Sequence, residues 1–303
     1  MTDNYLDVDD LTPDELTAVL DRGAAYKEQL AAGEPHRDLP ERTLGMLFQK
    51  PSTRTRVSFE TGMTQLGGHA VFLGENDIQL GRGEPLKDTA RALSGYVDAL
   101  MARVFKHHNV EVLAEYADVP VVNGLTDDAH PCQTLADLLT IRETEGGFDG
   151  VSAAWVGDGN NVAQSFALGC ALTDIDLTVA TPEGYGIDDD VVERARDLGG
   201  DPTVTDDPVA AVEDADVIYT DVWISMGQED ERDVRMTDFE GFQVNEDLLA
   251  GAAPDASVMH CLPAHRGEEI TDAVIESDRS LVWRQAENRM HAQKGLLAHL
   301  LDA

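Results

Sequence analysis

Short apolar runs alternate with amphipathic stretches of roughly ten residues along the chain. The apolar runs predict strands, and the amphipathic stretches predict helices, in which apolar side chains recur every three or four residues. Strands that alternate with helices in this way are typical of parallel βαβ units. The predicted strands are 44–48, 70–73, 100–105, 120–122, 151–156, 177–180, 217–220 and 257–261. One predicted helix starts at Pro13, and a second follows the first strand and ends near Leu66. The other predicted helices are 86–97, 110–116, 134–143, 162–172, 189–198 and 285–301.

A glycine-rich break, Gly146-Gly147-Phe148-Asp149-Gly150, divides this alternation into two series. A chain of 303 residues is long enough for two domains that each have a hydrophobic core. We therefore predict an α/β protein with two domains, each a parallel sheet flanked by helices. The predicted domains are residues 1–145 and 146–284, and the C-terminal helix, within 285–303, is expected to cross back to the first domain.

The charge balance is strongly acidic, with 22 Lys and Arg residues against 58 Asp and Glu, a formal net charge of −36. Because 42% of the residues are hydrophobic, we predict a folded protein rather than an acidic disordered chain. A net charge this negative argues against nucleic acid or an anionic membrane as a partner. Only 5 of the bases are lysines, and this acid-rich, lysine-poor composition indicates adaptation to a salty, halophilic cytoplasm.

Three cysteines, Cys132, Cys170 and Cys261, are widely spaced and form no CxxC pair. They indicate neither a disulfide framework nor a structural zinc site, and we expect a reducing compartment. The N-terminal residues are acidic and include no apolar segment of a signal peptide. No run approaches the about 20 apolar residues of a membrane helix. We therefore expect a cytoplasmic protein with no membrane partner.

Basic residues gather in the first half of the chain. Nine lie within residues 42–106, whereas Arg194 and Arg196 are the only bases from Glu143 to Glu231. The segment Lys50-Pro51-Ser52-Thr53-Arg54-Thr55-Arg56 follows a predicted strand and precedes a helix. Backbone N–H groups and hydroxyls at a helix start bind phosphate, and an arginine fork holds two phosphate oxygens at once. We favour an anion site here over a simple Ser/Thr helix cap.

Two further segments also follow predicted strands. The histidine of His130-Pro131-Cys132-Gln133 could donate a hydrogen bond to a developing oxyanion, and Gln133 could bind an amide, although a capping histidine remains an alternative. Cys132 beside a proline is best interpreted as a packed small residue. Asp221 could pair with an ammonium group at the edge of the second sheet, or it could be a turn residue.

Gly157-Asp158-Gly159-Asn160-Asn161 resembles half of a dinucleotide-binding fingerprint, but the third glycine is missing. We therefore favour a polar ligand contact from Asn161 over a nucleotide. The thiol in His260-Cys261-Leu262-Pro263 could be a nucleophile, a ligand or packing. No Cys/His/Asn protease signature surrounds it, so a covalent thiol mechanism is disfavoured. His, Asp and Glu show no metal-ligand spacing along the chain, and we expect no metal.

Taken together, four segments occur in the order and spacing of the carbamoyltransferases: 52–56, 130–133, Asp221 with Ser225-Met226-Gly227, and 260–263. Over nearly its whole length the chain resembles the ornithine carbamoyltransferases of the aspartate/ornithine carbamoyltransferase family. The first two segments are shared with the aspartate branch. The Ser-Met-Gly loop and Cys261 favour the ornithine branch, as does the scarcity of bases in the second half.

The resemblance implies that the first domain binds carbamoyl phosphate, the second binds L-ornithine, and carbamoyl transfer gives L-citrulline and phosphate without a cofactor. The residues implied to bind carbamoyl phosphate are Ser52, Thr53, Arg54, Thr55, Gln79, Arg103, His130, Pro131, Cys132, Gln133, Cys261, Leu262 and Arg289; those implied to bind ornithine are Asn161, Asp221, Ser225 and Met226. The residues implied to be catalytic are Arg54, Arg103, His130, Asp221 and Cys261. Gln79 aligns with a residue that reaches a neighbouring subunit's site, which implies a homotrimer or a multiple of trimers.

Several alternatives stay open at this stage. The protein could be a related carbamoyltransferase that uses putrescine or an acylated ornithine. It could also be a nucleotide-dependent dehydrogenase, although the third glycine of that fingerprint is missing. A third alternative is a non-catalytic relative, against which the presence of Arg54, His130 and Cys261 argues. The direction of the reaction in the cell and the number of trimers are also left open.

Overall fold

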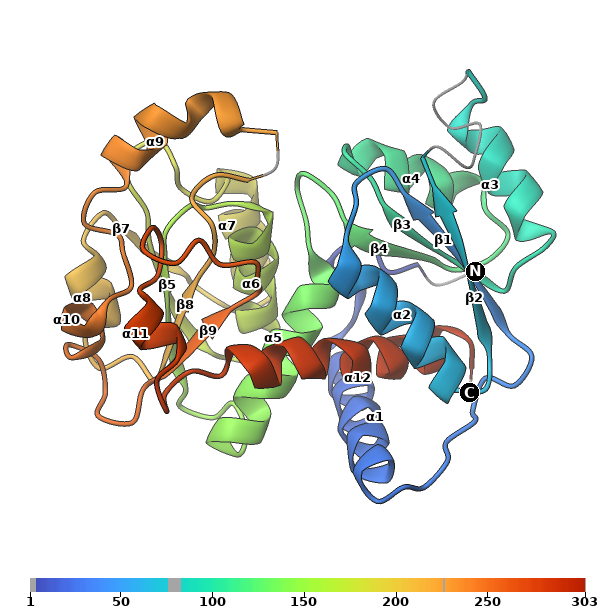
Figure 1. Cartoon of the computed structure of the whole chain (residues 1–303), viewed down its shortest axis with the longest axis horizontal. Coiled ribbons are helices and arrows are strands. Elements are labelled where there is room, and N and C mark those ends of the chain that lie inside the picture. Colours follow the sequence, from blue (N-terminus) through green and yellow to red (C-terminus); the bar gives the residue numbers. More distant parts are fainter. Residues whose placement is uncertain (1–3, 76–82, 226, 303) are drawn as a thin grey trace. The chain divides into compact units, whose positions relative to one another are not determined.

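The computed structural model describes residues 4–75, 83–225 and 227–302. Its internal contacts divide the chain into two compact units, of which unit 1 comprises Met1–Leu139 and Asn288–Ala303, and unit 2 comprises Thr140–Glu287. Each unit contains one parallel sheet with helices packed around it (Figure 1). The predicted α/β class with two helix-flanked parallel sheets is confirmed. No helix among the described residues is long and apolar enough to cross a membrane.

Unit 1 is built on a four-stranded sheet in the order β2-β1-β3-β4, with every neighbouring pair parallel. Its strands are β1 (Thr43–Phe48), β2 (His69–Gly74), β3 (Ala99–Arg103) and β4 (Val121–Leu125). Its helices are η1 (Val8–Asp10), α1 (Pro13–Ala31), α2 (Thr53–Gln65), α3 (Leu86–Ser94), α4 (His107–Tyr116), the start of α5 (Pro131–Glu145) and the end of α12 (Val282–Leu300).

Alternating residues of β3 define the two faces of this sheet. Leu100 and Ala102 are fully buried in the cluster that includes Val110 and Leu113 of α4, on the side covered by α3 and α4 (Figure 1). Side chains in a strand alternate between faces, so Met101 lies on the opposite face, where it is also fully buried. Burial on both faces is typical of parallel sheets, and a fully buried leucine or methionine side chain stabilises the fold by about 1.5–3 kcal/mol.

The end of α12 packs against α1 within unit 1, as predicted for the closing helix. A Cβ on Gly295 would lie 2.3 Å from the carbonyl oxygen of Val19, and one on Gly23 would lie 3.1 Å from the carbonyl oxygen of His291. These glycines allow the two backbones to approach closely, because any side chain at Gly295 would overlap α1. The close crossing fixes the part of α12 that carries Arg289.

Unit 2 contains a five-stranded parallel sheet in the order β7-β6-β5-β8-β9. The strands are β5 (Ser152–Val156), β6 (Asp176–Ala180), β7 (Thr203–Thr205), β8 (Val217–Thr220) and β9 (Ser257–His260). The helices are α6 (Asn161–Leu172), α7 (Asp189–Asp197), α8 (Pro208–Val212), η3 (Glu229–Glu231), α9 (Arg232–Asp238), α10 (Glu246–Leu249) and α11 (Asp272–Ile275).

β5 and β8 form the centre of unit 2. Trp155 packs against Tyr219 with ring centroids 4.8 Å apart, and Phe166 of α6 meets Tyr219 edge-on at 5.0 Å. Ala154 and Val156 face the other way, into a cluster that includes Phe239. The sheet therefore has apolar packing on both faces, which rigidly positions the loops that follow its strands.

The structure adds elements that the apolar pattern did not predict. β7 is a three-residue edge strand whose central Val204 is half exposed, so it lacks a continuous apolar run. The helices α8 to α11 are four to seven residues long, too short to show a helical period.

Buried imidazoles in unit 1 predict a pH-dependent stability. Burial, reinforced by Lys294, Lys27 and His36, lowers the pKa of His291 to about 3. Unfolding exposes this histidine, whose pKa then returns to about 6.5, so below that pH the unfolded chain binds more protons than the folded one. We expect the free energy of unfolding to fall between pH 7 and pH 5 in molar KCl, and less steeply in His291→Asn. Denaturant unfolding at a series of pH values measures this free energy. An equal dependence on pH in the unmodified protein and in His291→Asn would contradict the prediction.

Candidate functional site

In each sheet, the first strands in chain order extend the sheet on one side of its first strand, and the later strands extend it on the other side. The reversal lies between β1 and β3 in unit 1 and between β5 and β8 in unit 2. Ligands of open α/β sheets bind at the carboxyl ends of the strands beside such a reversal. The two clusters described below, one in each unit, follow these strands.

The start of α2 follows β1. Ser52 is its N-cap: the Oγ atom accepts the N–H of Thr55 at 3.3 Å and donates to the Thr55 Oγ1 at 3.0 Å. Thr53 and Arg54 are exposed, whereas Thr55 is fully buried. The helix cap is thus present, and the same geometry provides the partial positive charge that favours an anion at a helix start. The two interpretations of this segment are compatible.

Two buried arginines converge on Thr55. Arg289 Nη2 donates to Thr55 Oγ1 at 2.7 Å, and Arg103 Nη1 donates to the same oxygen at 3.5 Å. Arg103 ends β3, paired in register with Phe48 of β1, and Arg289 lies on α12. Both side chains are at most 6% exposed. Guanidinium groups at a helix start bind phosphate strongly through charge-assisted hydrogen bonds.

Arg289 also sets the state of His130 and Gln133. Its Nη2 lies 3.3 Å from His130 Nε2, and because arginine can only donate, this ring nitrogen is the acceptor. The pKa of His130 lies well below its ordinary value, chiefly because the ring is buried and further because of the charges of Arg289, Arg103 and Arg54. The ring is therefore neutral. Donation from Nε2 to a carbonyl oxygen would require the other tautomer and a shift of Arg289.

The side chain of Gln133 is held at both ends. Its Oε1 accepts from Arg289 Nη1 at 3.2 Å, and its Nε2 donates to Asp137 at 2.8 Å. The amide oxygen therefore lies on the arginine side, where it could accept from the NH2 of a carbamoyl group. Its orientation is fixed by α5, since Asp137 is one turn further along that helix.

Cys132 has a structural role. Its Sγ donates to the Asn123 carbonyl at 3.3 Å, and burial raises the pKa of this thiol to about 12. A thiol with such a pKa is not a nucleophile at neutral pH. Pro131 is also buried, and its carbonyl accepts from the Tyr5 hydroxyl at 3.2 Å.

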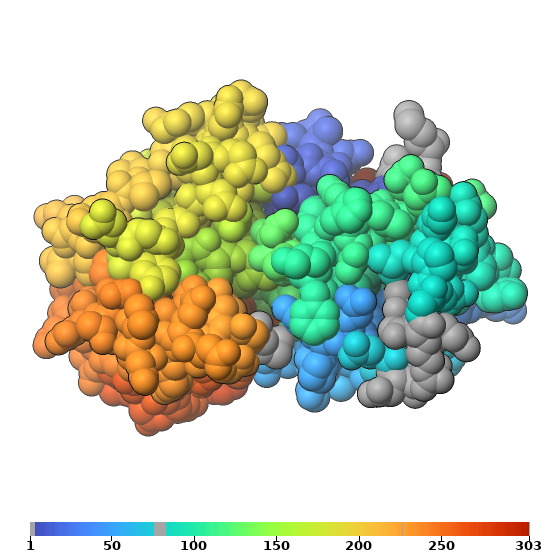
Figure 2. Space-filling view, turned by 90° about the horizontal axis from the view of Figure 1, so that it is seen from above, coloured from blue at the N-terminus to red at the C-terminus, as the bar shows by residue number. Residues whose placement is uncertain are grey.

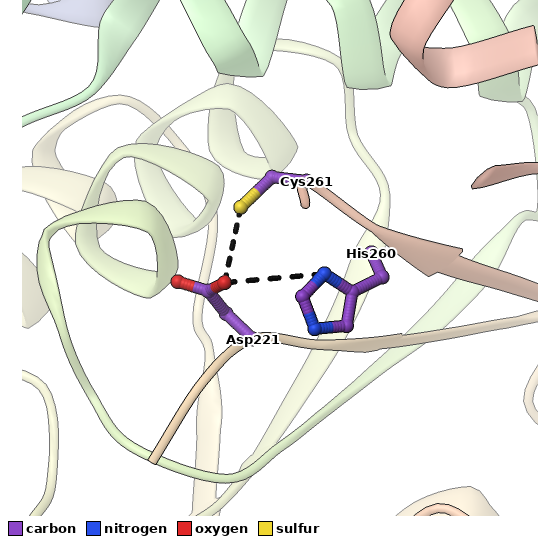
Figure 3. Close-up of side chains that lie close together, drawn as sticks. All are labelled: Asp221, His260 and Cys261. Carbon is purple, nitrogen blue, oxygen red and sulfur yellow. Dashed lines mark hydrogen bonds and ion pairs between the residues drawn. The ribbon is translucent and has the colours of Figure 1, made fainter. Parts of the chain in front are cut away.

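In unit 2, Asp221 accepts from two side chains. Its Oδ2 accepts from Asn160 Nδ2 at 2.9 Å. Its Oδ1 accepts from Cys261 Sγ at 3.1 Å and lies 4.0 Å from His260 Nδ1 (Figure 3). The carboxylate is 6% exposed. The cluster therefore presents a buried acid beside a half-buried thiol, and Asp221 belongs to the segment from Glu143 to Glu231 in which Arg194 and Arg196 are the only bases. This arrangement is suitable for a cationic ligand.

His260 fixes the loop that carries Cys261. Its Nδ1 accepts the N–H of Leu262 at 2.9 Å, so its Nε2 carries the proton and donates to Glu269 at 3.0 Å. Leu262 has a φ of +61°, a conformation that costs free energy in a leucine and must be held by its surroundings. The His260–Glu269 pair supplies part of that constraint and orients Cys261 toward Asp221.

Three ligand-type side chains, Asp221, His260 and Cys261, have their polar atoms within 4.8 Å of one another. They are the residues of this cluster that could hold a metal ion, and their separation along the chain explains why spacing did not reveal them. Each already has a protein partner, since Leu262 occupies His260 Nδ1 and Asp221 and Cys261 bond each other. A second group, His265, Glu268 and Glu269, is similarly close.

The glycines of Gly157-Asp158-Gly159 serve the fold. A Cβ on Gly159 would lie 2.3 Å from the carbonyl carbon of Gly186, so the glycine permits the chain to pack against its own backbone. A dinucleotide-binding glycine instead leaves room for a pyrophosphate. This geometry disfavours the dehydrogenase interpretation.

Of the four remaining predicted ligand residues, the structure describes two. Asn161 is half-buried and begins α6, and the half-buried Ser225 donates its backbone N–H to Gln228 Oε1 at 3.0 Å. Gln79 and Met226 lie outside the described residues. Sequence reasoning missed Asn160, whose position directly before a helix was the available signal. It also missed the His260–Glu269 pair, for which no local pattern exists.

Family comparisons cover almost the whole chain. Residues 3–143 match the model of the carbamoyl-P binding domain of aspartate/ornithine carbamoyltransferase, and residues 149–300 match its Asp/Orn binding domain. The chain belongs to the aspartate/ornithine carbamoyltransferase family. The resemblance inferred from the sequence segments is confirmed.

Individual relatives are similar over nearly their full length. The ornithine carbamoyltransferase of Haloquadratum walsbyi is 66% identical over 99% of this chain and 98% of its own. A relative from Pyrococcus furiosus, named as anabolic, is 56% identical over 97% of this chain and 95% of its own. A solved structure of ornithine carbamoyltransferase from Pyrococcus furiosus has a TM-score of 0.95 and 54% identity, and the match covers 100% of this chain and 98% of that one.

The three thiols should differ in reactivity. Cys132 and Cys170 are buried, whereas Cys261 is half-buried. In the folded protein we expect iodoacetamide to modify Cys261 at least about tenfold faster than the other two, because the buried thiols react only through opening of the fold. Peptide mass spectrometry measures the three rates, and Cys261→Ser is the control that should leave the slow labelling unchanged. Comparable rates at all three cysteines would contradict this assignment.

Proposed function

We propose that this protein transfers the carbamoyl group between carbamoyl phosphate and the δ-amine of L-ornithine, giving L-citrulline and phosphate, in a reversible reaction. One structural observation carries the proposal: Arg103 and Arg289 meet Thr55 at the start of α2, beside His130 and Gln133. The relatives named above are ornithine carbamoyltransferases, and the buried carboxylate of Asp221 agrees with a substrate that carries an amine.

In the proposed complex, unit 1 binds carbamoyl phosphate. The helix start from Ser52 to Thr55 holds the phosphate with Arg54, and Arg103 spans the phosphate and the carbamoyl oxygen. Thr55 polarises the carbonyl, and so does His130 once its Nε2 carries the proton and Arg289 has shifted. Gln133 holds the NH2 group, and Cys261, Leu262 and Arg289 also contact the carbamoyl group. Preorganised donors to a developing oxyanion lower the barrier by roughly 3 kcal/mol each.

Unit 2 is proposed to bind ornithine. Asn161, Asp221, Ser225 and Met226 hold its α-amino and α-carboxylate groups, and Asp221 and Cys261 lie near the reacting amine. A free alkylamine has a pKa of about 10, so the site must select or generate the neutral amine. The hydrogen bonds that Asp221 already accepts from Asn160 and Cys261 hold its carboxylate in place for this role.

The chemical step needs no cofactor in this proposal. The δ-nitrogen forms a bond to the carbamoyl carbon, the carbon–oxygen bond to phosphate breaks, and the electron pair leaves with the phosphate. The amine must also lose a proton, and the departing phosphate can accept it, so no dedicated general base is required. The role of His130 is then electrostatic, consistent with a neutral, deeply buried ring.

The active form is proposed to be a homotrimer or a multiple of trimers in the cytoplasm. The proposal of subunit assembly rests on Gln79, which aligns with a residue that reaches a neighbouring subunit's site. The net charge of −36 makes association of these subunits dependent on salt.

Citrulline formation in molar KCl tests the proposed activity. With carbamoyl phosphate as donor, we expect ornithine to be used with a kcat/KM at least about a hundredfold above that of putrescine, because putrescine lacks the groups that Asn161 and Ser225 would hold. Equal use of both amines would favour the putrescine alternative. Absence of carbamoyl transfer to either amine would contradict the proposed function.

Paired substitutions separate the two substrates. Arg54→Ala should lower kcat/KM for carbamoyl phosphate by more than about tenfold through loss of a charge-assisted contact, a cost of about 1.4 kcal/mol or more. Asp221→Asn should impair ornithine use and leave the Kd for carbamoyl phosphate unchanged. Arg91→Ala, in an exposed pair with Asp88, is the matched control and should behave as the unmodified protein. A folded Arg54→Ala with unchanged kinetics, or equal losses for both substrates in Asp221→Asn, would refute the corresponding assignment.

Salt dependence follows from the surface charge. At 0.01 M salt the Debye length is about 30 Å, so carboxylates repel one another across a subunit and between subunits, whereas at 1 M it is about 3 Å. Desalting should therefore dissociate the oligomer and abolish activity together. Sedimentation and citrulline assays across a KCl series measure both quantities. A fully active trimer at 0.01 M salt would show that the acidity is tolerated rather than required.

A further inference from the structure

A buried arginine in unit 2 has no role in the scheme above. Arg235 lies on α9, in a segment that forms part of the surface of unit 2 (orange in Figure 2). Nevertheless, Arg235 itself is only 7% exposed. Burial of a charged guanidinium is costly unless other groups pair with it and accept its hydrogen bonds. The partners of Arg235 therefore show what its position depends on.

Arg235 binds several parts of unit 2 at once. Its Nη1 donates to the Asp158 carboxylate at 3.1 Å and to the Trp223 carbonyl at 2.9 Å, and its Nε donates to Glu231 at 2.8 Å. The guanidinium also lies over the Tyr185 ring, 4.9 Å from its centroid. A planar fork with several donors can make these contacts simultaneously, whereas a lysine ammonium cannot reproduce their geometry.

Two of these partners belong to the loops that carry the proposed ornithine ligands. Asp158 is two residues from Asn160, which bonds Asp221, and Trp223 is two residues from Ser225. The pairing of β5 with β8 ends at Trp155 and Tyr219. Beyond that point the Thr220 hydroxyl donates to the Val156 carbonyl at 2.6 Å and Asn160 donates to Asp221. Arg235 adds a third link between the two loops, through Asp158 and the carbonyl of Trp223.

The bridge depends on charge. Burial raises the pKa of Asp158 to about 6, and Arg235 opposes that rise, so the carboxylate is ionised at neutral pH in contact with the arginine. Both side chains of the pair are less than 10% exposed. Loss of either partner would leave the other charged and buried, and the loops would move to solvate it.

We infer that Arg235 is a positioning residue for ornithine binding, which joins Asp158 to the backbone of Trp223 and so holds Asn160, Asp221 and Ser225 in place. The expected effect on the KM for ornithine rests on the proposed function. The expected effect on the mobility of the two loops does not, because it is measured in the protein without substrate.

The kinetic test is Arg235→Lys, assayed for citrulline formation in molar KCl. We expect the KM for ornithine to rise by about tenfold, while the Kd for carbamoyl phosphate and the melting temperature stay near those of the unmodified protein. Arg196→Lys is the matched control, because Arg196 is an exposed arginine of the same unit, paired with Asp201 at 2.8 Å. Its KM for ornithine should not change.

The structural test is hydrogen exchange of the ligand-free proteins. Arg235→Lys should accelerate amide exchange in the Gly157–Asn161 and Asp221–Ser225 loops by about tenfold, with no change in β5 or in unit 1. If Arg235→Lys does not fold, Glu231→Gln is the second variant, since Glu231 is largely exposed and its loss weakens only one contact. A smaller change in the same direction, about threefold in exchange and in KM, is then expected.

The outcomes separate the two proposals. If the unmodified protein makes no citrulline, the proposed function fails, and exchange in the two loops alone decides the role of Arg235. Unchanged loop exchange in the variant would overturn the inference. So would a KM for ornithine within twofold of the unmodified value, or equal losses for both substrates with a lowered melting temperature, which would indicate general destabilisation.

Discussion

The guanidinium of Arg289, buried in unit 1, is the interaction on which the proposed chemistry depends. It donates to Thr55 at the start of α2, to Gln133 on α5 and to the imidazole of His130 directly before α5. It thereby joins α12 to two segments that are far from it in the sequence. These three acceptors are neutral groups, so the charge of Arg289 stays available for a charge-assisted hydrogen bond to a bound anion, although Arg289 must shift from His130 before that ring can donate. The close crossing of α1 and α12 at Gly23 and Gly295 fixes the helix that supplies this arginine.

The charge distribution has a second consequence for the whole molecule. An acidic surface repels anions at long range, yet carbamoyl phosphate is an anion, and molar salt removes that conflict by screening. Short-range contacts with buried or partly buried arginines are screened much less than charges on the surface. In a salty solvent, an acid-rich surface is therefore compatible with the arginines of unit 1 that are proposed to bind an anion.

Much of the fold could be predicted from the sequence because the inner strands of both parallel sheets are buried on both faces, which leaves continuous apolar runs such as Leu44 to Phe48. β7 was missed because a half-exposed edge strand of three residues leaves no such run. Arg54, His130 and Asp221 could be named as candidates because each follows a strand. Arg235 and the His260–Glu269 pair could not be found in this way, since their roles are set by contacts made only in the folded chain.

The central claim is that the fork of Arg289 organises the carbamoyl phosphate site through Thr55, and a double-mutant cycle measures it most directly. The measurement is the calorimetric Kd for carbamoyl phosphate in Arg289→Lys, in Thr55→Val and in the double variant, in molar KCl. Each single change should weaken binding by more than about tenfold, and the double variant should bind no more than about threefold more weakly than the weaker single one, because the groups act as a unit. An Arg289→Lys protein that binds as tightly as the unmodified one, or fully additive losses, would contradict the claim.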